Sequence, residues 1–211
     1  MAEYKARARR ISLPRVLTST DLADFREKLV STATKLFAEK GRERFTMREV
    51  AAALGVSAMT PYRYFKDKEE ILAAVRAAAF NRFSDALEAA FDSTADPAER
   101  SNAVGRAYVR FAFAEPASYK LMFDMTQPEE TTYPELAKAV EGARRTMTAY
   151  VRGLVDTGLL EGDPVLIGHV FWASLHGAVV LQLAGKLDAE CDFDTIVHES
   201  FRALSVGFAP R

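Results

Sequence analysis

Apolar residues recur every three or four positions along most of this chain of 211 residues. That spacing places them on one face of an α-helix and predicts helices along almost the whole chain. No segment alternates apolar and polar residues as a half-buried strand does, and the sequence contains no Asn-Gly or Asp-Gly hairpin signal. The expected helices cover Asp21–Lys40, two short segments that begin at Thr46 and Ser57, a long segment from Asp67 that includes Phe91, and residues 97–114, 116–124, 133–157, 164–186 and 193–207. The sequence therefore predicts an all-α fold.

The stretch from Phe45 to Lys68 holds the clearest local signals. Thr46, with Glu49 three residues later, forms the capping-box pattern of a helix start. Gly55 suits the left-handed position that ends a helix, and Ser57 suits the N-cap of the next one. Two short helices joined by such a turn form a helix-turn-helix, whose second helix enters a DNA major groove. With the preceding helix, this predicts a homeodomain-like DNA-binding head of three helices.

Charge is distributed unevenly along the chain, although the formal net charge is only −1. Residues 1–70 hold 15 Lys and Arg against 10 Asp and Glu, whereas residues 71–211 hold 13 against 19. A basic N-terminal third that contains the helix-turn-helix suits contact with phosphates. The acidic remainder is not expected to bind DNA.

Composition excludes several protein classes. The single cysteine, Cys191, rules out an intramolecular disulfide and a cysteine-based zinc site, and it favours a reducing, cytoplasmic setting. The N-terminus lacks the apolar core of a secretory signal. Residues 1–20 form a basic segment that either reaches DNA as a flexible arm or is a disordered leader with solvated charges. Its basic residues are Lys5, Arg7, Arg9, Arg10 and Arg15.

The segment from Leu29 to Val75 resembles the TetR family of one-component bacterial transcription regulators. The likeness rests on the order of elements, the break at Gly41, Thr46, the turn Ala51–Leu54–Gly55–Val56–Ser57 and the run Tyr62-x-Tyr64-Phe65-x-x-Lys68. Phe171 to Leu181 also resembles the Trp-His-Gly signature of one C-terminal subclass. The resemblance implies a homodimer whose heads bind a palindromic operator and whose bodies hold a small-molecule pocket. Ligand binding then changes the spacing of the heads and releases DNA.

This reading divides the chain into an arm (1–20), a DNA-binding head (21–66) and a body for effector binding and dimerisation (67–211). The expected DNA contacts are Thr46, Arg48, Ser57, Ala58, Met59, Thr60, Tyr62, Arg63, Tyr64 and Lys68. Pro61 falls in the first turn of the second short helix, where the missing N–H is tolerated.

Different roles are expected within this set. Ala58, Met59, Tyr62 and Arg63 should face base edges, while Thr60, Tyr64 and Lys68 flank them beside the sugar-phosphate backbone. Thr46 and the helix N-terminus behind it should hold a phosphate. Arg48 occupies a position that can reach a guanine in the family, and Arg reads guanine through O6 and N7. The alternative for Arg48 and Arg63 is a solvated surface charge.

Residues Val165 to Gly185 include no Asp, Glu, Lys or Arg. By length this segment could span a membrane. Its two histidines, Gln182 and three glycines favour instead a helix buried between a pocket and a partner subunit. The predicted dimer interface is made by small residues of this helix and apolar residues of the last one: Ala173, Gly177, Ala184, Val197, Phe201 and Leu204. The alternative is that both helices fill the core of one chain.

An effector pocket is expected inside the body, lined by apolar and aromatic side chains that suit a small hydrophobic ligand. The candidates are Phe83, Phe111, Tyr119, Phe123, Met147, Tyr150, His169, Trp172 and His176. These aromatic and Met residues could equally be core, and either histidine could be a satisfied core residue. His169 and His176 are too far apart to share a metal easily, so neither a metal nor another cofactor is expected.

These observations predict a ligand-responsive transcription regulator, with the repressor role taken from the family alone. An architectural DNA-binding protein without a ligand is the first alternative, although it would not need so large a body. An enzyme is the second, but the sequence has no Gly-rich phosphate loop, nucleophile elbow or Ser/His/Asp order. Cys191 lies between Glu190 and Asp192, which disfavours a reactive thiolate.

Overall fold

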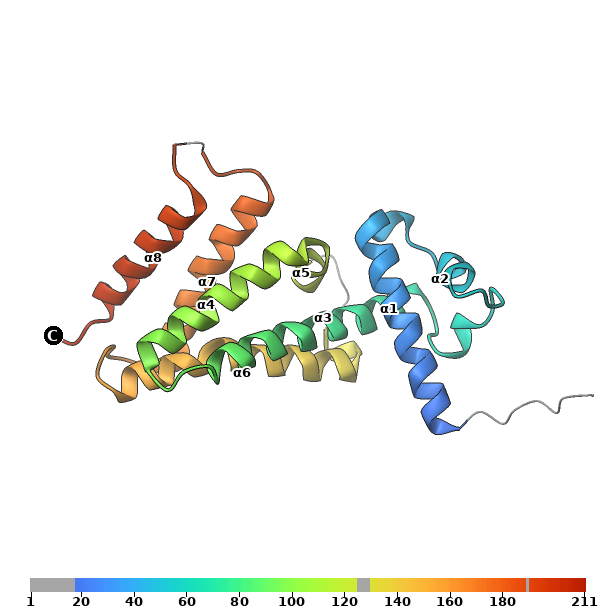
Figure 1. Cartoon of the computed structure of the whole chain (residues 1–211), viewed down its shortest axis with the longest axis horizontal. Coiled ribbons are helices and arrows are strands. Elements are labelled where there is room, and N and C mark those ends of the chain that lie inside the picture. The colour runs from blue at the N-terminus through green and yellow to red at the C-terminus, as the bar shows by residue number, and fades with distance from the viewer. Residues whose placement is uncertain (1–17, 125–129, 189) are drawn as a thin grey trace, which may run out of the picture.

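A computed structural model describes residues 18–124, 130–188 and 190–211, and the regular structure of these residues is entirely helical (Figure 1). The predicted all-α fold is confirmed. Residues 1–17, which hold all the basic residues of the predicted arm, lie outside the described residues, whereas residues 19 and 20 belong to the first helix. The α-helices are α1 (Ser19–Arg44), α2 (Met47–Ala53), α3 (Lys68–Phe91), α4 (Pro97–Ala114), α5 (Pro116–Met122), α6 (Pro134–Asp156), α7 (Pro164–Leu183) and α8 (Phe193–Gly207), and 3-10 turns are η1 (Pro61–Arg63) and η2 (Glu130–Thr132).

The helix limits follow from caps that are visible in the sequence. Asp96 and Asp163 accept hydrogen bonds from backbone N–H groups of the helices that begin after them, and each precedes a Pro at the first helical position. The Thr18 side chain accepts a hydrogen bond from the Asp21 N–H and so caps α1. The helix therefore begins at Ser19, two residues before the predicted start. Gly41, with φ of 72°, breaks α1 where the sequence predicts its end.

The long helix α3 joins the two halves of the molecule (Figure 1). Its first part packs against α1 in the head, and the rest packs against α4 and α6 in the body. Ile71 and Leu72 belong to the head core, whereas Phe83 and Leu87 belong to the body core. Because α3 is enclosed along most of its length, it links the head rigidly to the body.

The α5 helix also touches both cores. Its Leu121 is buried in the head cluster, while Tyr119, two residues earlier, is buried in the body cluster. The side chain of Arg76 on α3 donates to the backbone carbonyl of Met122 at 3.2 Å. A shift of α5 would therefore disturb both halves of the molecule.

The most apolar helix, α7, is exposed along one side. Val165, Leu166, Val180 and Leu181 are each 43–58% exposed. Among the described residues, α7 is the one helix long and apolar enough to cross a membrane, which is weak evidence because soluble core helices pass the same test. The sequence predicts that one side of this helix faces a pocket and another a partner subunit, and that arrangement stays a prediction because the single chain leaves one side exposed.

Candidate nucleic-acid interface and ligand pocket

The start of α2 is held by the predicted capping box. The Glu49 N–H donates to Thr46 Oγ1 at 3.3 Å, and the Thr46 N–H donates to Glu49 Oε2 at 3.0 Å. Lys40 of α1 pairs with the same carboxylate at 2.6 Å. Its hydrogen bond is the main cause that holds the pKa of Glu49 below its usual range. A phosphate at this end of α2 would therefore find the Thr46 N–H already bonded to Glu49 and the Glu49 N–H already bonded to Thr46 Oγ1.

Gly55 ends α2 as predicted. Its φ is 66°, its N–H donates to the Ala52 carbonyl at 3.1 Å, and the Val56 N–H donates to the Ala51 carbonyl at 3.0 Å. These two bonds form a Schellman motif, which requires a left-handed residue where Gly55 stands. The turn then directs the chain toward Ser57.

The second helix of the motif differs from the prediction. Instead of an α-helix from Ser57, the chain makes a turn over 58–60 and then the single 3-10 turn η1. Pro61 has no N–H to donate to the Ser57 carbonyl. The chain instead forms hydrogen bonds between residues three positions apart, from the Thr60 N–H to the Ser57 carbonyl and from the Arg63 N–H to the Thr60 carbonyl. The three-helix head is thus built from α1, α2 and this turn with η1.

Most of the predicted DNA-contacting side chains are exposed together at this end of the molecule. Met59 and Tyr62 are 67% and 44% exposed. The remaining exposed members of the set are Thr46, Arg48, Ser57, Ala58 and Arg63. Pro61 and Phe65 are buried beneath them and hold the segment against the head core.

Three members of the set have structural contacts as well. Thr60 is half-buried, and Tyr64 packs against Phe25 of α1 with ring centroids 5.2 Å apart. The Lys68 ammonium donates to the Arg42 carbonyl at 2.6 Å, which caps the end of α1. Lys68 therefore joins the end of α1 to the start of α3 besides carrying a charge.

The body contains a chain of buried polar groups. The indole N–H of Trp172 donates to the Tyr108 hydroxyl at 3.2 Å, which lies 2.7 Å from the Tyr119 hydroxyl. His176 Nδ1 lies 2.7 Å from the Tyr119 hydroxyl and 3.1 Å from the Tyr108 hydroxyl. These residues come from α4, α5 and α7, so the chain ties three helices together.

Protonation along this chain follows from burial. Burial lowers the pKa of His176, so its ring is neutral at neutral pH and Nδ1 can accept. Burial also raises the pKa of Tyr108 to about 12 and that of Tyr119 above its usual range, so both keep their protons. Because Trp172 can only donate, the Tyr108 hydroxyl accepts from it, and either tyrosine hydroxyl can donate to the other.

A small cavity of about 20 Å³ lies beside this chain. Three of the predicted pocket residues, Met147, Tyr150 and Trp172, line it, together with Leu87, Val104, Gly105, Tyr108, Phe171 and Leu175. The Tyr150 side chain is 7% exposed, and its hydroxyl has no hydrogen-bond partner among the described residues. The volume accepts about one water molecule, so a larger ligand requires side chains to move.

Other predicted pocket residues lie outside this cavity lining. Phe83 and Phe111 pack on each other in the body core at 5.2 Å, and Phe123 packs on His176 at 4.6 Å. His169 makes no hydrogen bond to the polar chain among the described residues: its Nδ1 lies 2.8 Å from the Val165 carbonyl of its own helix, and its ring lies 6.1 Å from that of Trp172. Tyr108 was not among the predicted site residues, because its helical spacing in the sequence marks it only as a core residue of α4.

The predicted dimer residues fall into two groups. Ala173 and Ala184 are exposed on α7, and a Cβ added at Gly177 would meet nothing within 4 Å. The three residues of α8, namely Val197, Phe201 and Leu204, are half-buried and pack against the body core of their own chain. The α7 side is therefore open to a partner, whereas the α8 stripe also serves the core.

The fold and the exposed head define a helix-turn-helix protein of the DNA-binding regulator class. Residues 29–75 match the family model described as "Bacterial regulatory proteins, tetR family", and residues 101–204 match "Tetracyclin repressor-like, C-terminal domain". The chain belongs to the TetR family and is a DNA-binding transcriptional regulator, not an enzyme. The Trp-His-Gly subclass stays a prediction.

Individual relatives agree with this assignment. The chain is 26% identical over 190 residues to an HTH-type transcriptional regulator of Mycobacterium tuberculosis, covering 88% of this chain and 82% of that one. It is 28% identical over 136 residues to the HTH-type transcriptional activator FasR of Mycolicibacterium smegmatis, covering 64% and 61%. A solved structure from Rhodococcus sp. RHA1, of a protein of unknown function, superposes with a TM-score of 0.77 at 25% identity, covering 94% and 100%.

Proposed function

We propose that this regulator is a cytoplasmic homodimer that binds a palindromic operator, represses transcription there, and leaves the DNA when a small hydrophobic effector enters the body. The head supports the first part of the proposal. Arg48, Tyr62 and Arg63 are exposed together on one end of the molecule, and no described residue pairs with either arginine. Free guanidinium groups suit base edges and phosphates.

The observation that carries ligand control is the buried polar chain from Trp172 to His176. Burying a polar group in an apolar core costs free energy unless the group is hydrogen-bonded. Apolar side chains would therefore stabilise this core at least as well. A ligand that competes for the Tyr119 hydroxyl would displace α5. Because Met122 of α5 binds Arg76 and Leu121 packs in the head core, this displacement reaches the head.

Footprinting on the DNA that flanks the protein's own gene tests this proposal. We expect a symmetric protected site that disappears when an effector is added. Transcription from the same DNA gives the sign of regulation, which matters because one relative is named an activator. A protected half-site without symmetry, or protein that stays monomeric on the DNA, would contradict the dimer.

A ligand-independent architectural protein is the competing function. Thermal unfolding with a library of small apolar compounds separates the two, since a ligand that binds only the folded state must raise the unfolding temperature. For a true effector, His176→Asn should change the affinity, while His169→Asn on the same helix serves as the matched control.

A further inference from the structure

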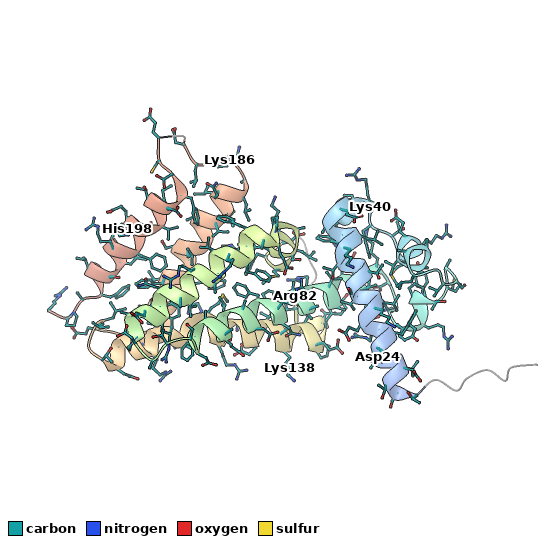
Figure 2. All side chains as sticks on the ribbon, in the orientation of Figure 1. Asp24, Lys40, Arg82, Lys138, Lys186 and His198 are labelled. Atoms are coloured by element: carbon teal, nitrogen blue, oxygen red, sulfur yellow. The ribbon has the colours of Figure 1, made fainter. Side chains whose placement is uncertain are left out.

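A long groove of about 820 Å³ runs between α4 and α8, on the body. His198, on α8 in Figure 2, is one of its lining residues. Its apolar lining comes from four helical segments, with Gly105, Val109, Phe171, Leu175, Val197 and Phe201 as the main contributors. The volume lies within the range of small-molecule sites. The groove therefore offers more room than the 20 Å³ cavity on the other side of the same wall.

That wall is thin. Gly105, Phe171 and Leu175 line both the groove and the small cavity beside Tyr150. Gly105 contributes no side chain, and a Cβ built on it would meet nothing within 4 Å. None of the residues of α8 is fully buried, although Val197 and Phe201 pack against the body core.

The rim of the groove is cationic, although the body as a whole is acidic. Arg106 and Arg110 lie one turn apart on α4, are exposed, and make no ion pair with any described residue. Arg202, on the opposite rim, is paired with Glu199 at 2.8 Å, and Asp194 is the one carboxylate among the lining residues. Two neighbouring guanidinium groups suit a carboxylate, which they can bind through charge-assisted hydrogen bonds.

We infer that the groove between α4 and α8 binds an elongated apolar carboxylic acid, with the carboxylate at Arg106 and Arg110 and the chain along the apolar floor. The inference rests on the proposed function, because it gives the chemical class of the effector. The acid enters between the two helices, and its chain pushes past Gly105 toward the cavity beside the polar chain. An uncharged ligand of the same length lacks the rim contact and binds more weakly.

Calorimetric titration of the full chain with dodecanoate and with 1-dodecanol tests the inference. Both probes have the same chain length, both are used below the concentration at which they aggregate, and only one is charged. We expect dodecanoate to bind about tenfold more tightly than the alcohol, the effect of one good charge-assisted contact. Equal affinity for the two probes, or no binding of dodecanoate, would overturn the inference.

Two variants locate the site. The double variant Arg106→Gln with Arg110→Gln should lose the preference for the acid but still bind the alcohol, while Arg152→Gln, an exposed arginine of α6 outside the groove, should behave as wild type. Gly105→Leu should weaken both probes without loss of thermal stability, because leucine favours a helix more than glycine does. A full preference for the acid in the double variant would place the carboxylate elsewhere and refute the assignment.

Light scattering on the same samples tests a different occupant, a second copy of this chain. If the double variant changes the oligomeric state and leaves dodecanoate binding intact, the groove is an interface between copies and the inference is wrong. Failure of the inference is distinguishable from failure of the proposed function. If only the inference is wrong, the wild type still protects a symmetric operator and is released by another compound. If the proposed function is wrong, the wild type does neither.

Discussion

Arg48 and Lys68 both carry a positive charge in the head, but their surroundings differ. Arg48 is exposed on α2 and has no partner among the described residues. Lys68 is half-buried and donates to the Arg42 carbonyl at 2.6 Å. The first side chain is free to select a base, whereas the second is held by the protein and adds charge at a constant position.

The two variants should therefore weaken DNA binding in different ways. Arg48→Ala should relax the preference at one base pair by ~1–3 kcal/mol and leave the unfolding temperature unchanged. Lys68→Ala should weaken all sequences alike, lower the salt dependence by about one unit of slope, and cost about 1 kcal/mol of stability. Fluorescence anisotropy over a set of operator variants and salt concentrations measures both, with Arg152→Ala as the control. A sequence-dependent loss for Lys68→Ala would contradict this assignment of roles.

His176 carries the pH dependence of the body. Burial lowers its pKa below the ordinary value of 6.5, so the unfolded chain takes up the proton first as the pH falls. Protonation also leaves Nδ1 able only to donate to the Tyr119 hydroxyl, which lies 2.7 Å away. The stability that the neutral ring contributes is therefore complete above about pH 6.5 and is lost below it.

We expect the unfolding temperature to fall between pH 7.5 and pH 5.5 and this fall to be smaller in His176→Asn. Asparagine keeps an acceptor close to the Nδ1 position but does not titrate. His169→Asn, which changes a half-buried histidine of the same helix, should retain the wild-type pH dependence. The same fall in His176→Asn as in wild type would assign the effect to another group.

At the scale of elements, Gly55 determines the path of the chain from α2 into η1. Its left-handed φ of 66° allows the Schellman bonds that release the backbone toward Ser57. Gly142, in the middle of α6, offers a matched comparison because a Cβ would meet nothing within 4 Å at either position. The two positions differ in backbone conformation and not in space.

Gly55→Ala should destabilise the protein by about 1–2 kcal/mol, the cost of a left-handed residue with a Cβ. It should also reduce operator affinity, because the turn that carries Met59, Tyr62 and Arg63 would shift. Gly142→Ala should instead stabilise the protein by about 1 kcal/mol, since glycine is a poor residue inside a helix. Chemical denaturation measures both values. A loss of stability in both variants would show that space, and not φ, decides.

At the scale of the whole molecule, the geometry of the proposed dimer would set the distance between its two heads. The exposed face of α7 carries Val180, Leu181 and the small residues around Gly177, which let a second helix approach closely. A contiguous exposed apolar face of this kind is typical of an interaction site. It lies on the body, away from the head at the other end of α3 (Figure 1).

Gly177→Gln should weaken dimerisation without unfolding the chain, because the new side chain has room in the single chain but would enter the partner. Light scattering as a function of concentration should show monomers at concentrations where the wild type is dimeric. Gly142→Gln on α6 should remain dimeric. A dimeric Gly177→Gln protein would move the interface away from this part of α7.

Several features were predictable from the sequence, and others were not. The caps at Thr46 and Asp96 and the break at Gly41 were predicted because each depends on contacts within four residues. The α-helix expected at Ser57 was wrong because the effect of Pro61 on so short a segment was underestimated. The polar chain could not be assembled in advance, because it joins three helices.

The sequence by itself determined the fold class, nearly all helix limits and the position of the DNA-binding head, since capping and periodicity are local properties. Only the tertiary structure decided that Tyr108 and Tyr119 meet His176, 68 and 57 positions away in the chain, that Lys68 caps α1, and that α7 keeps an exposed side. These features depend on the angles at which helices pack, and those angles follow from the summed shape of many side chains.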